Sequence, residues 1–132
     1  MSPCLLDTNI LLAATIAPER LPPQVQATLI DPGIQVLFSA ASIWEIAIKY
    51  SLNRTSFDFQ PQDVHTLALE TGFTELPITA EHTHATASMP WHHRDPFDRL
   101  LIAQAAHLQA RLYTSDATLP KYSDLITLVT LR

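Results

Sequence analysis

Short apolar runs alternate along the chain with longer segments in which apolar residues recur at helical spacing. The runs that predict strands are 3–6, 34–38, 73–76, 112–114 and 126–131. The segments that predict helices are 10–14, 24–30, 39–50, 61–70, 79–89 and 96–108. Because strands that alternate with helices form βαβ units, the pattern favours an α/β fold with a mostly parallel sheet between layers of helices.

The most apolar of these predicted helices follows a polar loop. Asp95 is a good N-cap, because its carboxylate can accept hydrogen bonds from the first helical turn, and Pro96 suits the next position. Nearly every residue from Leu100 to Leu108 is apolar, which predicts a helix that is buried on most sides. Asp98 falls in its first turn, beside the core. A favourable interaction with the helix dipole would by itself account for an acid there.

Three further acids stand beside apolar segments. Asp7 ends the first predicted strand, and Asp116 follows the fourth. If these strands are parallel, both carboxylates emerge at the carboxyl edge of the sheet, where ligands bind in such folds. The third acid belongs to the one polar stripe of an otherwise apolar helix, which consists of Ser42, Glu45 and Lys49.

Each acid also has a simpler explanation. Asp7 can cap the helix that follows it, Asp116 can be a turn residue, and Glu45 can pair with Lys49 one helical turn away. Packing four carboxylates together is unfavourable, however, because like charges raise one another's pKa. One or two divalent cations would relieve that repulsion. Hard oxygen ligands without cysteine favour Mg²⁺ or Mn²⁺ over zinc.

Composition limits the class of protein. With 132 residues, of which 47% are hydrophobic and 16% charged, we expect one domain over residues 1–132 with its own core. Cys4 is the single cysteine, and no apolar run approaches the roughly 20 residues that span a bilayer, so we expect a cytoplasmic protein without membrane contact. The net charge of −5 argues against a broad basic surface for nucleic acid, but not against an enzyme whose metal ions supply positive charge.

Four motifs, in order, resemble those of PIN-domain ribonucleases, and most of all the VapC toxins of bacterial toxin–antitoxin pairs. They are Leu5-Leu6-Asp7-Thr8-Asn9, Ser42-Ile43-Trp44-Glu45-Ile46-Ala47-Ile48-Lys49, the stretch from Asp95 to Ala105, and Thr114-Ser115-Asp116. The block Asp-Pro-Phe-Asp-Arg-Leu-Leu-Ile-Ala-Gln-Ala is the most specific of them. The resemblance extends from residue 5 to about residue 129.

The resemblance implies a PIN-like three-layer fold and hydrolysis of RNA phosphodiester bonds with Mg²⁺ or Mn²⁺. Its catalytic and metal-binding acids correspond to Asp7, Glu45, Asp98 and Asp116. Supporting or substrate-contacting positions are Thr8, Asn9, Ser42, Lys49, Arg99 and Ser115. Lys49, Arg99 and the further candidate Arg94 could each contact phosphate, although an ion pair within the cleft is the favoured role for each. The resemblance also implies a homodimer and a protein antitoxin. It leaves open whether transfer, ribosomal or messenger RNA is cut.

Other interpretations remain. A metal-dependent interaction or regulatory module without nuclease activity would use the same acids. A zinc site is disfavoured, because a His-x-His pair on a helix points its rings apart and no fourth-ligand pattern appears; its candidate ligands are His82, His84, His92 and His93. Asn9 argues against haloacid-dehalogenase-type phosphatases, which need aspartate there. An apolar surface for a partner, or simply core, is expected from Trp44, Tyr50, Phe57 and Phe59.

Overall fold

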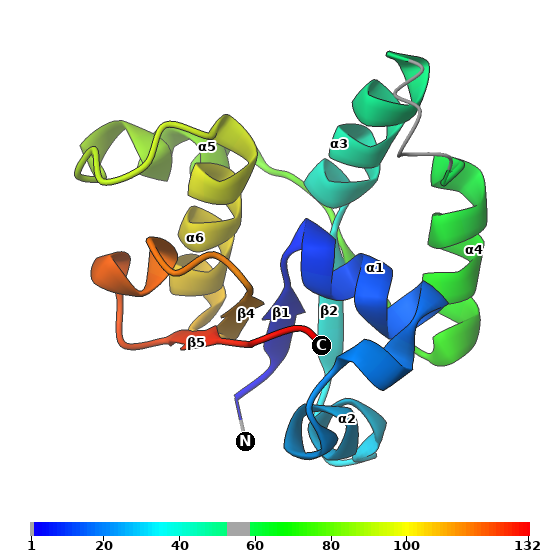
Figure 1. The fold of residues 1–132 in the computed structure, drawn as a ribbon. Helices are drawn as coiled ribbons and strands as arrows, with labels where there is room; N and C mark the ends of the chain where they lie inside the picture. Colours follow the sequence, from blue (N-terminus) through cyan, green and yellow to red (C-terminus); the bar gives the residue numbers. More distant parts are fainter. Residues whose placement is uncertain (1, 53–58) are drawn as a thin grey trace.

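The computed structural model describes residues 2–52 and 59–132. Within them, a five-stranded sheet has the order β3-β2-β1-β4-β5, and all neighbouring strands are parallel (Figure 1). The strands are β1 (Cys4–Leu6), β2 (Val36–Ser39), β3 (Thr74–Leu76), β4 (Arg111–Thr114) and β5 (Ile126–Leu128). The helices are α1 (Thr8–Ile16), α2 (Pro23–Ile30), α3 (Ala40–Ser51), α4 (Pro61–Thr71), α5 (Ala80–Ala85) and α6 (Pro96–Leu108), with 3₁₀ turns η1 (Pro18–Arg20), η2 (Thr86–Ser88) and η3 (Leu119–Tyr122). The predicted α/β fold is confirmed.

The two faces of the sheet pack against different helices. Successive side chains of a strand point to opposite faces, so Leu5 and Leu6 enter different hydrophobic clusters. Leu5 belongs with Leu101 of α6, whereas Leu6 belongs with Ile10 of α1 and with residues of α3 and α4. The central strand β1 is buried along its whole length, which explains why its sequence has no polar alternation.

Capping groups fix the starts of the two helices beside the central strands. Ser39 Oγ accepts from the backbone N–H of Ala41 at 3.0 Å at the start of α3. Asp95 Oδ1 accepts from the backbone N–H groups of Phe97 at 2.8 Å and Asp98 at 3.2 Å at the start of α6. Both helices therefore begin where the sequence predicts, and the N-cap assigned to Asp95 is confirmed.

Three predicted segments differ from the structure. The helix expected to reach Met89 ends as α5 at Ala85 and continues only as the 3₁₀ turn η2, whose Thr86 carbonyl accepts from Arg99. The last strand ends at Leu128, because it pairs only with β4, which itself ends at Thr114. Helix α6 is buried at 101–105 but exposed at 106–108, so its expected burial on most sides does not extend to its last turn.

The four aromatic residues expected to form a partner surface or core have different positions. Trp44 is 60% exposed, Tyr50 is 40% exposed, and Phe59 is partly buried against the cluster that contains Leu6. Phe57 lies outside the described residues. Trp44 and Tyr50 thus belong to the surface of α3, and Phe59 contributes to the core.

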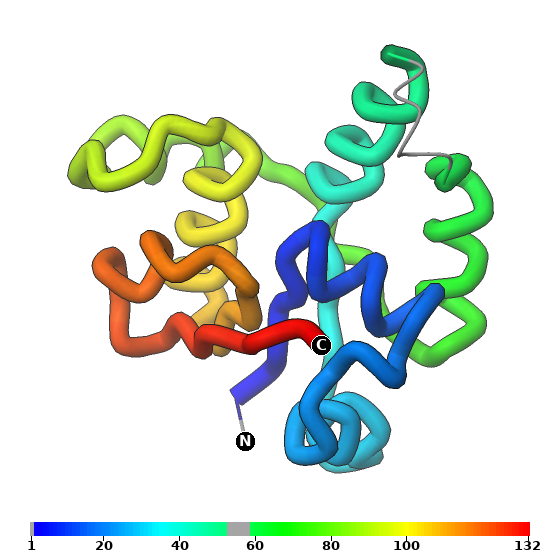
Figure 2. The backbone as a smooth tube through the Cα atoms, in the orientation of Figure 1, coloured from blue at the N-terminus to red at the C-terminus, as the bar shows by residue number. Residues whose placement is uncertain are grey.

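The end of the chain returns to its first third. The C-terminal segment runs across the front of the molecule toward α1 (Figure 2). Arg132 donates its backbone N–H to the carbonyl of Arg20 at 2.9 Å, and Arg20 Nε donates to the carbonyl of Arg132 at 3.0 Å. These two hydrogen bonds connect the C-terminal residue to η1.

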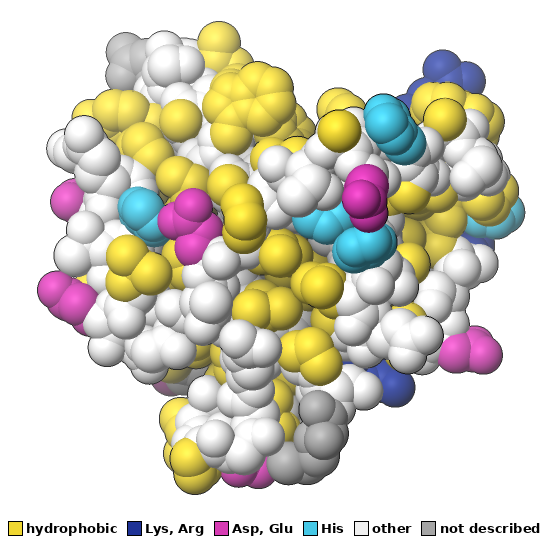
Figure 3. All heavy atoms as spheres, turned by 180° about the vertical axis from the view of Figure 1, so that it is seen from behind, with side chains coloured by type: hydrophobic (Ala, Val, Ile, Leu, Met, Phe, Trp, Pro, Cys, Tyr) yellow, Lys and Arg dark blue, Asp and Glu magenta, His cyan; other side chains and the backbone are white. Residues whose placement is uncertain are grey.

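The face opposite to that view carries hydrophobic, acidic and histidine side chains (Figure 3). Lys and Arg side chains appear there mainly at the margins, so the described part of this face offers no broad basic surface. Among the described residues, no helix is both long enough and apolar enough to cross a membrane.

Gln109 ends α6 in the left-handed region, with φ 52° and ψ 40°. Such a conformation costs a non-glycine residue about 1–2 kcal/mol, and the greater backbone freedom of glycine in the unfolded chain offsets part of the gain from replacing it. We therefore expect Gln109→Gly to raise the free energy of unfolding by roughly 0.5–1 kcal/mol, as measured by urea denaturation. Gly72→Ala, at φ 99° with no atom within 4 Å of the added Cβ, should lower it. Changes of the same sign would contradict this account.

Candidate active site

Asp7 lies at the carboxyl end of β1 and caps α1. Its Oδ1 accepts from the backbone N–H of Ile10 at 2.9 Å, and its Oδ2 accepts from Thr114 Oγ1 at 2.5 Å. Burial raises the pKa of the Asp7 carboxyl above its ordinary value, although these hydrogen bonds and one from the backbone of Ser115 act in the opposite direction. The ionised form of Asp7 would therefore gain from a nearby positive charge.

Glu45 reaches the same edge of the sheet from α3. Thr8 Oγ1 donates to Glu45 Oε1 at 2.6 Å and also lies 3.0 Å from Ser42 Oγ. Lys49 Nζ lies 3.1 Å from Glu45 Oε2. The polar stripe of α3 thus faces the end of β1, and a hydroxyl and an ammonium group orient the two oxygens of Glu45.

Asp116 follows β4, the strand next to β1. Its Oδ1 accepts from Thr118 Oγ1 at 2.7 Å and from the backbone N–H of Thr118 at 2.8 Å. The hydroxyl of Thr118 in particular holds the pKa of Asp116 below its ordinary value. The backbone N–H of Asp116 donates to Thr114 Oγ1 at 3.0 Å, so one threonine connects the Asp116 backbone to the Asp7 carboxylate.

Asp98 approaches from the first turn of α6, together with His93 from the preceding loop. His93 Nε2 lies 2.8 Å from Asp98 Oδ2 and 3.6 Å from Asp116 Oδ2. Burial raises the pKa of Asp98 to about 6; the hydrogen bond with His93 lowers it, and the charges of Asp95 and Asp7 raise it. The imidazole therefore lies between two carboxylates that would otherwise repel each other.

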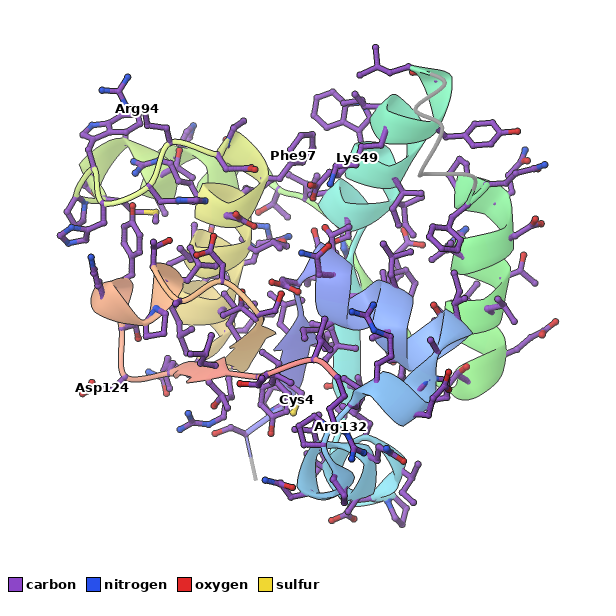
Figure 4. All side chains as sticks on the ribbon, viewed as in Figure 1. Cys4, Lys49, Arg94, Phe97, Asp124 and Arg132 are labelled. Atoms are coloured by element: carbon purple, nitrogen blue, oxygen red, sulfur yellow. The ribbon has the colours of Figure 1, made fainter. Side chains whose placement is uncertain are left out.

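These side chains line one cavity of about 240 Å³ at the carboxyl edge of the sheet. Its lining consists of Asp7, Thr8, Asn9, Glu45, Lys49, His93, Asp95, Asp98 and Asp116. The helices on either side are in contact, since the rings of Trp44 on α3 and Phe97 on α6 meet edge-on at 5.2 Å between centroids. Figure 4 shows Phe97 and Lys49 approaching each other from these two helices. The cavity is predominantly acidic.

Comparison with protein families gives a match over most of the chain: the family model described as PIN domain covers residues 4–125. The chain belongs to the PIN domain family. Among curated proteins, none matches this PIN domain.

Solved structures share the fold of this PIN domain at low sequence identity. VapBC2 from Rickettsia felis, bound to a DNA fragment from its promoter, has 15% identity and a TM-score of 0.69, with 96% of this chain and 98% of that chain covered. A toxin–antitoxin complex from Klebsiella pneumoniae has 17% identity and a TM-score of 0.62, with 94% and 95% covered. FitAcB from Neisseria gonorrhoeae has 19% identity and a TM-score of 0.60, with 95% and 96% covered.

The cavity of this PIN domain suits a hard divalent cation. One ligand atom from each of His93, Asp98 and Asp116 lies within 4.8 Å of the others. The pKa values of Asp7 and Asp98 are raised, so full ionisation of the cavity is unfavourable until a positive charge is supplied. PIN domains generally use divalent metals, and the oxygen donors present here fit Mg²⁺ or Mn²⁺.

Arg99 does not take the cleft-facing position that the sequence suggested. Its side chain is buried, and it is absent from the cavity lining. The guanidinium donates to the carbonyls of Thr86, Met89, Pro90 and His93 and to the Tyr122 hydroxyl. Backbone carbonyls and a hydroxyl therefore accept from both terminal nitrogens of Arg99, and the structure places this residue outside the cavity lining.

The other supporting positions differ in how close they lie to the cavity. Thr8, Asn9 and Lys49 line the cavity, whereas the buried Ser42 lies behind Thr8. Ser115 contributes its backbone N–H to Asp7. Arg94 lies outside the cavity lining and points toward solvent (Figure 4).

Sequence reasoning missed three residues that act on the acids: His93, Thr114 and Thr118. Thr118 had a usable signal, because a threonine two residues after an aspartate is typical of a turn in which the carboxylate accepts its hydrogen bonds. Thr114 ends an apolar strand and gave no sign of its bond to a residue 107 positions away. His93 is one of two adjacent histidines, and only the folded loop distinguishes them.

The raised pKa of Asp98 predicts how stability depends on pH in the metal-free protein. The native state binds this proton more tightly than the unfolded chain, so the contribution of Asp98 to stability falls as pH rises from about 4 to about 6 and is constant above that. In the presence of EDTA, the melting temperature of Asp98→Asn relative to the parent should therefore increase across that range.

Asp95→Ala should instead melt below the parent at pH 7, through loss of its N-cap, at a cost of roughly 0.5–2 kcal/mol. If Asp98→Asn melted below the parent at pH 7 and Asp95→Ala did not, Asp98 would be the N-cap and Asp95 the acid of the cavity.

Proposed function

We propose that this chain is an endoribonuclease that depends on Mg²⁺ or Mn²⁺ and acts as one domain over residues 1–132. The observation that carries the proposal is the placement of Asp7, Glu45, Asp98 and Asp116 around one small cavity. Membership of the PIN domain family supports it, since PIN domains are generally nucleases. A carboxylate-lined cavity repels an anionic backbone unless cations are bound there, so acidity and nuclease function are compatible through metal binding.

The four acids would hold one or two ions. When bound, an ion supplies positive charge that lowers the pKa of the attacking water and offsets charge on the scissile phosphate and the leaving 3′ oxygen. The protein keeps the donor oxygens in place beforehand: Thr114 orients Asp7, Thr8 orients Glu45, and Thr118 orients Asp116. His93, Asp98 and Asp116 each bring one ligand atom within 4.8 Å of the others, so these residues would be among those that hold an ion.

RNA as the substrate and a toxin role are supported by the four sequence motifs and by the fold. The Klebsiella pneumoniae structure is a toxin–antitoxin complex, and the Rickettsia felis structure is VapBC2 bound to DNA. By this likeness the chain acts in the cytoplasm as the toxin of a type II pair, forms a homodimer and is inhibited by a protein antitoxin. The exposed Trp44 and Tyr50 on α3 offer apolar area for such contacts.

Cleavage of single-stranded RNA by the purified chain tests the enzymatic part. We expect cleavage that requires Mg²⁺ or Mn²⁺, stops with EDTA, and falls by roughly 100-fold or more in Asp7→Asn and Asp116→Asn, because removing a carboxylate weakens metal binding. Asp124→Asn is the matched control, since Asp124 is exposed and is not among the residues that line the cavity. It should retain parental activity.

The competing interpretation, a metal-dependent interaction or regulatory module, gives a different result in the same experiment. The chain would then bind Mn²⁺ in calorimetry through Asp7 and Asp116 while leaving RNA intact. Equal cleavage by the parent and by both variants would instead show that the four acids are not the catalytic site.

Growth of a bacterial host tests the biological part. Induced expression of the chain should arrest growth, because an endoribonuclease without its inhibitor degrades RNA that the host needs. Asp116→Asn should not arrest growth, and co-expression of the product of an adjoining small reading frame should restore growth in cells that express the parent. If Asp116→Asn also arrested growth, the toxicity would not come from RNA cleavage.

Light scattering tests the homodimer and should give twice the monomer mass of 14.7 kDa.

A further inference from the structure

The loop that precedes α6 has no regular secondary structure, but hydrogen bonds from a buried side chain hold its backbone in place. Residues 89–95 connect η2 to α6, and the buried Arg99 binds three of their carbonyls. Nη1 donates to Pro90 O at 2.9 Å and to His93 O at 3.3 Å, and Nη2 donates to Met89 O at 3.3 Å. The backbone of this loop is therefore held by the protein itself before any ligand binds.

Trp91 on this loop is 72% exposed. One face of its indole lies against Arg99, whose Cζ is 3.8 Å from the ring centroid. This cation–π contact favours one orientation of the ring, because the guanidinium is itself held by hydrogen bonds. The remaining surface of the indole is left to solvent. An oriented and exposed indole adds little to folding, but it is a suitable surface on which another planar group can stack.

Arg94 lies beside Trp91, and the two residues line an open recess of about 540 Å³. Figure 4 shows Arg94 pointing away from the body of the protein. His93, its neighbour in sequence, points the other way, since its Nε2 binds the Asp98 carboxylate. Each residue of extended chain spans at most about 3.6 Å, so the recess and the acidic cavity are adjacent along a single short loop.

We infer that Trp91 stacks against an unpaired base of the RNA and that Arg94 contacts the phosphate next to that base. The inference rests on the proposed ribonuclease function and adds to it a site that holds single-stranded substrate beside the cavity. An aromatic face and a cation close together are the two elements with which proteins hold single-stranded nucleic acid. The net charge of −5 provides little general attraction for RNA, so a contribution that does not depend on charge is needed.

Binding is measured with Asp116→Asn protein, which the proposed function predicts to be inactive, and short single-stranded RNA that carries 2-aminopurine at successive positions. We expect the probe fluorescence to be quenched at one position by stacking. Adding Trp91→Ala should remove that quenching and weaken binding by roughly 5- to 100-fold. Trp91→Phe, which keeps an aromatic face, should retain most of both effects. Unchanged quenching and affinity in Trp91→Ala would overturn the inference.

Salt dependence separates the two residues. Arg94→Gln should reduce the slope of log affinity against log salt by about 0.7, the value expected for one phosphate contact on a single strand. Trp91→Ala should weaken binding and leave the slope unchanged, because stacking releases no counterions. A common change in slope for both variants would contradict the separate roles given to them.

Active protein and a control variant complete the test. In the parental background, Trp91→Ala should raise KM for RNA with little change in kcat, whereas Ile30→Ala, at an 82% exposed position on α2, should change neither. RNA cleavage that is insensitive to Trp91 would refute the stacking site and leave the proposed function intact. Absence of cleavage by the parent would refute the proposed function instead. If Trp91→Ala changed the mass of the protein in sedimentation without changing its affinity for RNA, the recess would be a contact between protein copies, and the inference would be overturned.

Discussion

Repulsion between carboxylates at one edge of a parallel sheet is the constraint on which the arrangement of this PIN domain depends. Asp7 is buried, and Asp98 is buried enough for its pKa to rise to about 6. Thr8, Thr114 and Thr118 each donate to an acid, and His93 lies between two of them. These partners lower the free-energy cost of placing the acids together in the folded chain, but they do not neutralise the charge of the cluster. The remaining negative charge is what a divalent cation would bind.

Arg99 influences that site indirectly, through the loop that precedes α6. It is a buried cation whose donors are directed to backbone carbonyls rather than to the acids. Satisfying carbonyls of the loop before α6 orders a segment that has no regular secondary structure. The same loop carries His93 toward the acids and Trp91 toward solvent, so one buried side chain sets the geometry of both the cavity and the neighbouring recess.

Local physical chemistry was enough to predict most of the fold. Apolar runs such as Cys4–Leu6 form buried strands because a parallel sheet buries both of its faces. Helix starts at Ser39 and Asp95 follow from side chains that accept hydrogen bonds within their own helix. Ends were predicted less well. The end of β5 depends on how far its partner strand extends, and the helix predicted over 79–89 ends at Ala85, where the chain continues as the turn whose Thr86 carbonyl accepts from Arg99.

For the site, the sequence by itself determined which acids are available and that two of them, Asp7 and Asp116, follow strands. The four motifs that contain these acids were enough to suggest the PIN domain family, because each motif is a short continuous stretch of sequence. Only the tertiary structure decided which groups donate hydrogen bonds to these acids and orient them. Thr114 reaches Asp7, 107 residues away, because β1 and β4 are neighbours in register, and Arg99 lies outside the cavity lining because carbonyls of η2 and of the loop after it accept its hydrogen bonds. Such pairings depend on distances between segments far apart in sequence, which no local pattern encodes.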